Sequence, residues 1–369
     1  MNQPKLVVCH VLNELLPSGA ETMLVNSAKE WHDCELHVLG TQKELGIYKD
    51  EFKKAGYTVH HVYKHGFIKQ HMAVVKFFKE LKPDVVHVHR ESQECYYEFD
   101  ARVAGVPRIV RTVHSVFSFS GILRLRRTVT RTIGRELGTK YVAISQSVYE
   151  NERTTFKNTP FALIDNWCDE HRFHFAEREL NTGKDMVIIS VGNCGLAKNH
   201  MFILQGILEL VESGCTQLHY YHVGSGTDET AEKEFVEKNN LQSYVTFAGH
   251  ADPLPFLKKA SLFVMPSAYE GVGISAIEAM YMGIPCLLTD VNGLKDFKAL
   301  QSKDVNFCKL NQSDFNSKLH ELYQMNLAGK LQRSKSLSDK AAKKYSMKKS
   351  VDTYLNVYRE RDACKQRER

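Results

Sequence analysis

A chain of 369 residues is longer than one hydrophobic core usually supports, so two domains of ordinary size are expected. Apolar residues at 43% and charged residues at 25% are typical of a folded globular protein, and they exclude a disordered, collagen-like or coiled-coil chain. The formal net charge is only +6, but basic residues are concentrated at positions 124–140 and 340–349, which is compatible with an anionic partner.

Short apolar runs predict buried strands, and the longer amphipathic segments between them predict helices. In the first half, strands are predicted at residues 6–12, 34–39, 57–62, 83–89, 108–113 and 141–144. The pattern stops between residues 165 and 185, which predicts a linker. It then starts again, with strands predicted at residues 185–191, 218–223, 244–247, 262–265, 286–289 and 305–308.

This alternation predicts an α/β fold in which each half is a doubly wound parallel sheet. The expected domains are residues 1–168 and 183–349, and a helix at about 350–369 is expected to close back on the first domain. The nine cysteines are scattered and never spaced as Cys-x-x-Cys, which disfavours a disulfide framework and a zinc site. This cysteine pattern indicates a reducing, cytoplasmic compartment, and neither a signal peptide nor a membrane span is apparent.

The segment Ser267–Pro285, SAYEGVGISAIEAMYMGIP, places Glu270 and Glu278 around a Gly-x-Gly between two apolar strands. The order strand, tight turn, helix leaves unpaired N–H groups at the helix start, which suits a phosphate or sugar oxygen. An ionised carboxylate accepts two hydroxyl donors at once, so two glutamates suit a ligand with a diol at each end. Taken alone, the segment is equally compatible with a surface helix carrying solvated glutamates. The flanking strands and Gly283-Ile-Pro285 favour a binding site.

Together with Val223-Gly-Ser-Gly226 and Gly249-His250, this segment resembles the donor-binding core of glycosyltransferase family 4. Further resemblances are found at Pro17–Glu21, Asp84–His89 and Asp165–Asp169. The resemblance implies the GT-B fold, in which two Rossmann-like domains face each other. It also implies transfer of a sugar from a nucleotide sugar with retention at the anomeric carbon.

By resemblance, Glu278 would hold the ribose hydroxyls of the donor and Glu270 would contact the transferred sugar. Lys198 would meet the diphosphate and His114 would contact the sugar near the reacting centre, so the catalytic residues are predicted to be Glu270, His114 and Lys198. The predicted donor-binding residues are Gly19, Asn193, Gly224, Gly249, His250, Gly271, Val272, Gly273, Ile274 and Glu278. Without the resemblance, a solvated loop lysine and a packed histidine at a strand end are the more ordinary interpretations. Asn193 stands where the family commonly has arginine, which leaves Lys198 to neutralise the diphosphate.

The segment 121–135 mixes apolar residues with Arg124, Arg126, Arg127, Arg131 and Arg135 at near-helical spacing. This pattern is typical of an interfacial helix on anionic lipid, and equally of a core-packed helix with a solvated basic face. The family's use of lipid-linked acceptors favours the first. A nucleic-acid partner is not expected, because aromatic residues are not interleaved with these charges.

The expected activity is therefore retaining transfer of a hexose or N-acetylhexosamine from a nucleotide sugar, with UDP favoured and GDP second. The acceptor would be a hydroxyl of a glycan or of a polyprenyl-diphosphate-linked glycan in surface polysaccharide biosynthesis, at the inner face of the cytoplasmic membrane. No cofactor or metal is expected, since the sequence has no Asp-x-Asp motif. Two alternatives remain: a nucleotide-sugar 2-epimerase of GT-B fold, and a non-catalytic two-domain sugar-binding protein. A dinucleotide oxidoreductase is disfavoured, because no strand leads into a Gly-x-Gly-x-x-Gly.

Overall fold

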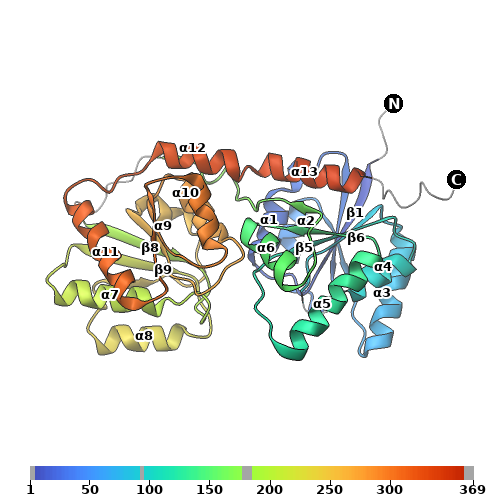
Figure 1. Cartoon of the computed structure of the whole chain (residues 1–369), viewed down its shortest axis with the longest axis horizontal. Helices are drawn as coiled ribbons and strands as arrows, with labels where there is room; N and C mark the ends of the chain where they lie inside the picture. Colours follow the sequence, from blue (N-terminus) through green and yellow to red (C-terminus); the bar gives the residue numbers. More distant parts are fainter. Residues whose placement is uncertain (1–4, 92–94, 177–184, 361–369) are drawn as a thin grey trace. The chain divides into compact units, whose positions relative to one another are not determined.

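The computed structural model describes residues 5–91, 95–176 and 185–360. The chain divides into two compact units. Unit 1 contains the residues up to Trp167 together with those from Met347 onward, and unit 2 is Cys168–Ser346. Each unit is built on a parallel sheet with helices on both faces (Figure 1).

The sheet of unit 1 has seven strands in the order β3-β2-β1-β4-β5-β6-β7, all paired in parallel. Its strands are β1 (Leu6–Leu12), β2 (Cys34–Gly40), β3 (Thr58–His61), β4 (Val85–Val88), β5 (Arg108–Val113), β6 (Thr139–Ala143) and β7 (Ala162–Leu163). Central parallel strands are covered on both faces, which explains why β1 and β4 were recognisable as mainly apolar runs, each containing one histidine.

The helices of unit 1 cover both faces of this sheet, with α1 and α2 on one side and α3, α4 and α5 on the other (Figure 1). They are α1 (Gly19–Asn26), α2 (Lys49–Lys54), α3 (Phe67–Leu81), α4 (Tyr96–Val103), α5 (Gly121–Glu136), α6 (Gln146–Thr155) and α13 (Met347–Arg359), with a short 3₁₀ helix, η1 (Ala28–Glu30). Helix α6 begins where the Ser145 hydroxyl accepts a hydrogen bond from the backbone N–H of Val148, the usual N-cap arrangement.

The basic helix α5 is held to unit 1 by buried ion pairs. Arg131 is 1% exposed, and its guanidinium contacts the Glu152 carboxylate at 2.7 Å and Glu91 at 2.9 Å. Arg127 donates a hydrogen bond to the Glu91 carbonyl at 2.6 Å and lies over the Phe119 ring. The prediction that all five arginines form one solvent-facing basic surface is therefore wrong for Arg131 and in part for Arg127, because buried carboxylates draw these side chains inward.

The sheet of unit 2 has six strands in the order β10-β9-β8-β11-β12-β13, again all parallel. Its strands are β8 (Met186–Val191), β9 (Leu218–Val223), β10 (Val245–Phe247), β11 (Leu262–Met265), β12 (Cys286–Thr289) and β13 (Val305–Cys308). Its helices are α7 (Met201–Glu212), α8 (Glu229–Lys238), α9 (Leu254–Lys259), α10 (Ile274–Tyr281), α11 (Gln312–Leu327) and α12 (Lys335–Lys344), with the 3₁₀ helix η2 (Leu294–Leu300). Helices α7 and α8 lie on one face and α9 and α10 on the other (Figure 1).

The C-terminal helix α13 begins at Met347, three residues before the predicted start, and packs on unit 1. Its Tyr358 ring stacks on Trp31 at a centroid distance of 5.6 Å, and its Ser350 hydroxyl donates to the Asp165 carbonyl. The predicted fold class, two doubly wound parallel-sheet domains with a C-terminal helix returning to the first, is thus confirmed.

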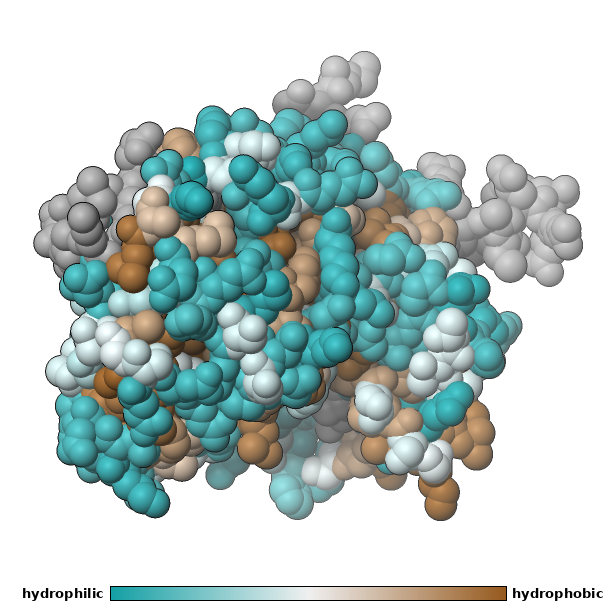
Figure 2. All heavy atoms as spheres, turned by 60° about the vertical axis from the view of Figure 1, so that its left-hand side comes forward, coloured by the Kyte–Doolittle hydropathy of each residue, from teal (hydrophilic) through white to brown (hydrophobic). Residues whose placement is uncertain are grey.

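One face of the protein is mainly polar. Figure 2 shows one face on which hydrophilic side chains predominate and hydrophobic ones lie scattered among them. Among the described residues, no helix combines the length and the apolar character that crossing a bilayer requires.

Candidate active site

The strand order of unit 2 reverses between β8 and β11, and ligands of open α/β sheets bind beyond the carboxyl ends of the strands at such a switch point. Two loops leave the sheet there. The loop after β8 carries Asn193 and Lys198, and the loop after β11 carries Glu270 and leads through Gly273 into α10. The predicted donor-binding residues of both loops therefore lie where this fold places a ligand.

Lys198 and Glu270 form an ion pair across this switch point. The Lys198 ammonium lies 2.5 Å from the Glu270 carboxylate, which also accepts a hydrogen bond from the Ser267 hydroxyl at 2.9 Å. Both side chains keep some exposure, 26% for Lys198 and 13% for Glu270. The two loops are tied together by their backbones as well, since Ala268 N–H donates to the Ala197 carbonyl at 2.8 Å. The pair is therefore accessible from solvent but held in position.

Close backbone packing explains the glycines around this pair. Gly273 has φ +76°, and a Cβ there would lie 3.0 Å from the Met265 sulfur. A Cβ at Gly224 would overlap the Gly192 carbonyl oxygen at 1.9 Å, because these two loops pass in contact. Gly224 also donates its N–H to the Gly249 carbonyl at 2.9 Å. The loops that contain Gly192, Gly224 and Gly249 therefore meet beside the end of the sheet.

Glu278 lies in the second turn of α10 and is mostly removed from solvent. Burial raises the pKa of its carboxyl from 4.5 to about 8, while the nearby Arg172 guanidinium opposes this shift. Arg172 in turn forms an ion pair with Asp252. A carboxyl with this pKa is largely protonated at neutral pH until a ligand or a cation favours its ionised form.

The raised pKa makes the stability of the protein depend on pH through Glu278. The unfolded chain loses this proton near pH 4.5, whereas the folded protein keeps it until about pH 8, so the contribution of Glu278 to stability is complete below pH 4.5 and is lost as pH rises to about 8. Glu278→Gln removes the titration. In thermal melts, the Tm of the variant relative to the wild type should rise from pH 5 to about pH 8 and level off above it, and a constant difference across this range would contradict the assignment.

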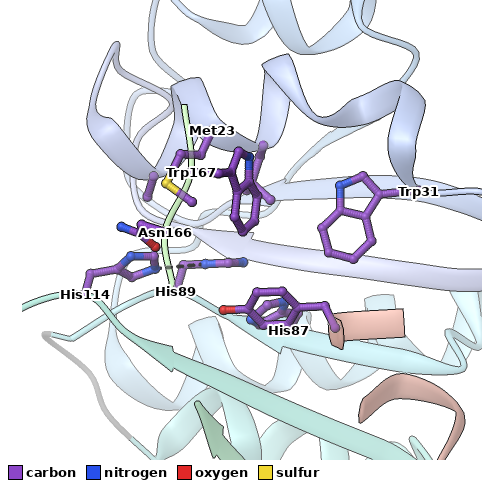
Figure 3. Close-up of a pocket in the computed structure, with 10 residues that line it drawn as sticks. Met23, Trp31, His87, His89, His114, Asn166 and Trp167 are labelled. Carbon is purple, nitrogen blue, oxygen red and sulfur yellow. Dashed lines mark hydrogen bonds between the residues drawn. The ribbon is translucent and has the colours of Figure 1, made fainter. Parts of the chain in front are cut away.

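A chain of histidines lies in unit 1, formed by His10 on β1 and by His89 and His114 directly after β4 and β5; Figure 3 shows the contact between His89 and His114. The Nε2 atom of His114, which follows β5, lies 3.0 Å from the Nδ1 atom of His89. The Nε2 atom of His89 in turn lies 3.0 Å from the Nδ1 atom of His10. Burial lowers the pKa of His114 to about 4 and that of His10 to about 3. All three rings are therefore neutral at physiological pH.

His89 and His114 border a small pocket of unit 1 (Figure 3). Its free volume of about 10 Å³ is room for about one water molecule. The lining residues are Ala20, Met23, Leu24, Trp31, His87, His89, His114, Asn166, Trp167 and Tyr354. The pocket thus combines an apolar wall with two of the chained histidines and the amide of Asn166.

The sequence matches two family descriptions over most of its length: "Glycosyltransferase Family 4" at residues 17–172 and "Glycosyl transferases group 1" at residues 185–325. The chain belongs to glycosyltransferase family 4. The predicted resemblance is confirmed, and the protein is a glycosyltransferase.

Relatives of this family 4 enzyme come from several bacteria. EpsF of Bacillus subtilis is 27% identical over 79% of this chain and 80% of its own length. The Escherichia coli UDP-Gal:alpha-D-GlcNAc-diphosphoundecaprenol alpha-1,3-galactosyltransferase is 25% identical over 61% of this chain and 62% of its own. The capsular polysaccharide biosynthesis glycosyltransferase CapH of Staphylococcus aureus is 25% identical over 74% and 78%.

Solved structures share the fold at low sequence identity. A glycosyltransferase from Rickettsia africae has a TM-score of 0.78 at 15% identity and covers 96% of this chain and 98% of its own. Anabaena HepE, crystallised with UDP and glucose, has a TM-score of 0.78 at 14% identity and covers 95% and 98%. These likenesses support the GT-B fold.

The structure of the family 4 enzyme distributes the predicted site residues over both units. Unit 2 gathers most of them around its sheet end, namely Asn193, Lys198, Gly224, Gly249, His250, Glu270, Gly271, Val272, Gly273, Ile274 and Glu278. Gly19 and His114 belong to unit 1. Asn193 and His250 are exposed, while the glycine turn before α10 is buried.

Three groupings were not apparent from the sequence. One is the Lys198–Glu270 pair itself, whose members are 72 residues apart. Another is the position of Arg172 beside Glu278, and the third is the continuation of His114 into His89 and His10. The sequence gave a partial signal for the last, since His87 and His89 are two residues apart at the end of β4 and so lie on the same side of the extended chain.

Proposed function

We propose that this glycosyltransferase transfers a hexose or N-acetylhexosamine from a nucleotide sugar to a hydroxyl of a glycan or lipid-linked glycan, in polysaccharide or glycolipid biosynthesis. The observation that carries the proposal is the Lys198–Glu270 pair at the switch point of unit 2, with Glu278 on the helix that follows. UDP is the favoured carrier. HepE binds UDP and glucose, and the names of the Escherichia coli and Staphylococcus aureus relatives describe a UDP-galactose donor and capsular polysaccharide biosynthesis.

In this proposal Lys198 neutralises the diphosphate of the donor. The Lys198 ammonium is already positioned by Glu270 at 2.5 Å, so a bound donor gains a cation whose side chain is ordered beforehand. The start of α10 adds partial positive charge beside it, because the peptide dipoles of a helix point their positive ends toward its N-terminus. Stabilising the leaving diphosphate in this way requires no catalytic metal, which is part of the proposal.

Glu270 and Glu278 bind hydroxyl groups at the two ends of the donor. Glu270 contacts the transferred sugar, and Glu278 accepts the ribose hydroxyls, whose hydrogen bonds favour its ionised form. The acceptor hydroxyl attacks the face from which the diphosphate departs, and a departing phosphate oxygen takes its proton, so the anomeric configuration is retained. No covalent sugar–enzyme bond is required.

His114 is assigned to the transferred sugar, near the reacting carbon. Burial keeps its imidazole neutral, with a pKa of about 4, so it serves as a hydrogen-bonding group and not as a cation at pH 7. The contact of His114 with His89 fixes the orientation of the ring. In this role His114 positions the transferred sugar and does not act as an acid catalyst.

A thermal-shift panel with UDP-, GDP-, ADP- and CMP-sugars tests the donor assignment, because a ligand that binds the folded state raises the apparent Tm. UDP-sugars should give the largest rise, and Glu278→Ala should abolish it. A panel in which no nucleotide sugar shifts the Tm contradicts the proposal. Product analysis with the best donor alone separates transfer from the alternative epimerase, which would release a 2-epimer of the sugar without any acceptor.

Peripheral binding to an anionic membrane through α5 is a further part of the proposal. The helix exposes apolar side chains to solvent, with Ile122 at 87% and Leu125 at 64%. The exposed arginines of the same helix are Arg124, Arg126 and Arg135. Apolar groups flanked by arginines are the arrangement that inserts at an anionic lipid interface.

Replacing Arg124 and Arg126 with glutamine should lower partitioning onto phosphatidylglycerol-containing vesicles by about 30-fold, since each interfacial arginine contributes about 1 kcal/mol. Sedimentation with vesicles of defined composition measures this. Lys318→Gln with Lys335→Gln removes the same charge from exposed helix positions of unit 2 and should leave partitioning unchanged. Equal binding of wild type and the arginine variant would contradict a role for α5.

A further inference from the structure

Four side chains that commonly ligate metals meet in the interior of unit 2. Cys194 lies in the loop after β8, His200 precedes α7, His222 is on β9, and Glu232 is on α8. None of the four is more than 4% exposed, and one ligand atom from each lies within 4.8 Å of the others. Because they come from four separate elements, no spacing in the sequence indicated this cluster.

The distances within the cluster suit a tetrahedral ion. Cys194 Sγ lies 3.1 Å from His222 Nε2, and His200 Nδ1 lies 3.4 Å from a Glu232 carboxylate oxygen. Zinc bonds of about 2.0–2.3 Å at tetrahedral angles place neighbouring ligand atoms roughly 3.3–3.6 Å apart. The other separations among the four ligand atoms are at most 4.8 Å, so the side chains need to close on one another by no more than about 1–1.5 Å to bind one ion.

Two atoms of the cluster lack a partner that a cation would supply. Among the described residues, His200 Nδ1 and Glu232 Oε2 have no hydrogen-bond partner although both are buried. Leaving such atoms unsatisfied is costly in the interior of a protein. His222, in contrast, has its Nδ1 3.1 Å from the Ser190 hydroxyl, which leaves the Nε2 lone pair directed at Cys194. An outer hydrogen bond of this kind orients histidine ligands of metals.

The charges of the cluster also match zinc. A Cys194 thiolate and a Glu232 carboxylate together carry two negative charges, which a divalent ion cancels, and two neutral imidazoles complete the set. The thiolate disfavours Mg²⁺ and Ca²⁺, which prefer oxygen ligands. We propose that Cys194, His200, His222 and Glu232 bind one Zn²⁺ ion, and that binding releases the Cys194 thiol proton to solvent.

Such an ion would fix the loop that presents Lys198. Cys194 and His200 lie on either side of Lys198, and zinc would join both of them to β9 and α8. The ion is structural in this proposal. It touches neither Lys198 nor Glu270, so it is compatible with chemistry that needs no catalytic metal, and it goes beyond the proposed transfer reaction.

Elemental analysis of the full-length protein, purified without an affinity tag or chelator, tests the site. The wild type should hold about one zinc per chain, and Cys194→Ala and His222→Ala should each lower this content at least about tenfold. Cys286→Ala is the matched control, because Cys286 is equally buried, on β12 of the same unit, and should leave the zinc content unchanged. Zinc that persists in both cluster variants would overturn the proposal.

Cobalt substitution of the wild type keeps the test decisive where a variant fails to fold. Chelator-treated protein titrated with Co²⁺ should develop intense visible bands of a tetrahedral ion and a near-ultraviolet thiolate-to-cobalt band. Absence of the thiolate band overturns the proposal. Cobalt bound instead by the other histidine grouping, His10, His87 and His89, would have no sulfur ligand and would give no such band. Donor binding is measured separately, so failure of the zinc site does not affect the proposed reaction.

Discussion

Replacing Glu270 with glutamine is expected to lower kcat on the order of 100- to 1,000-fold while changing donor affinity much less. Glutamine keeps the size of the side chain and can still accept the Ser267 hydroxyl, but it loses the charge that holds the Lys198 ammonium at 2.5 Å. An unpaired Lys198 would no longer be ordered before the donor binds. Misplacing a charged group that stabilises the leaving diphosphate costs catalysis on this scale.

Initial rates with the best UDP-sugar, together with isothermal titration of the same donor, separate the two effects. Glu321→Gln is the control, since Glu321 pairs with Lys318 on the exposed side of α11 and should leave both constants unchanged. If Glu270→Gln turns over at the wild-type rate, Glu270 takes no part in the reaction and the assignment fails.

Glu278→Ala is expected to weaken donor binding by about 100-fold, because each hydrogen bond to a charged group contributes about 1.5–3 kcal/mol and a carboxylate can accept two ribose hydroxyls. The variant also removes a carboxyl whose pKa burial raises to about 8. Removing it relieves a cost of burial, so the free protein should not lose stability at alkaline pH. Binding and stability are therefore expected to change in opposite directions at pH 8 to 9.

Titration calorimetry at pH 8 measures the loss of affinity, and a thermal melt of the free variant checks the second expectation. Glu321→Ala, an exposed glutamate on α11, controls for loss of a carboxylate in the same unit. A Kd within about twofold of the wild type would show that the ribose hydroxyls are held elsewhere.

Much of the fold follows from local pattern. Central parallel strands are buried on both faces, so β1, β4, β8 and β11 are apolar runs that can be recognised without knowledge of their neighbours. Glu270, Gly273 and Glu278 were predictable for a related reason, because one continuous segment contains the strand end, the turn and the helix that position them.

Contacts between distant segments were not predictable in this way. Helical spacing placed Arg131 on α5 but could not indicate that Glu152 would draw it into the interior. In the same way, the pairing of Lys198 with Glu270 depends on which two strands border the switch point. The cluster around Cys194 requires four elements to converge, which only the packed structure specifies.

In the histidine chain of unit 1, the tautomer of one ring determines the tautomers of the other two. A neutral imidazole has one N–H and one bare nitrogen, so if His10 donates through Nδ1 to His89, then His89 donates through Nδ1 to His114. With this order the buried His10 Nε2, which has no hydrogen-bond partner, carries a lone pair and no hydrogen. Burying an unpaired lone pair costs less free energy than burying an unpaired N–H. The third ring then keeps its hydrogen on Nδ1. A buried nitrogen on β1 thereby decides that His114 offers a donor, not an acceptor, at its remaining ring nitrogen.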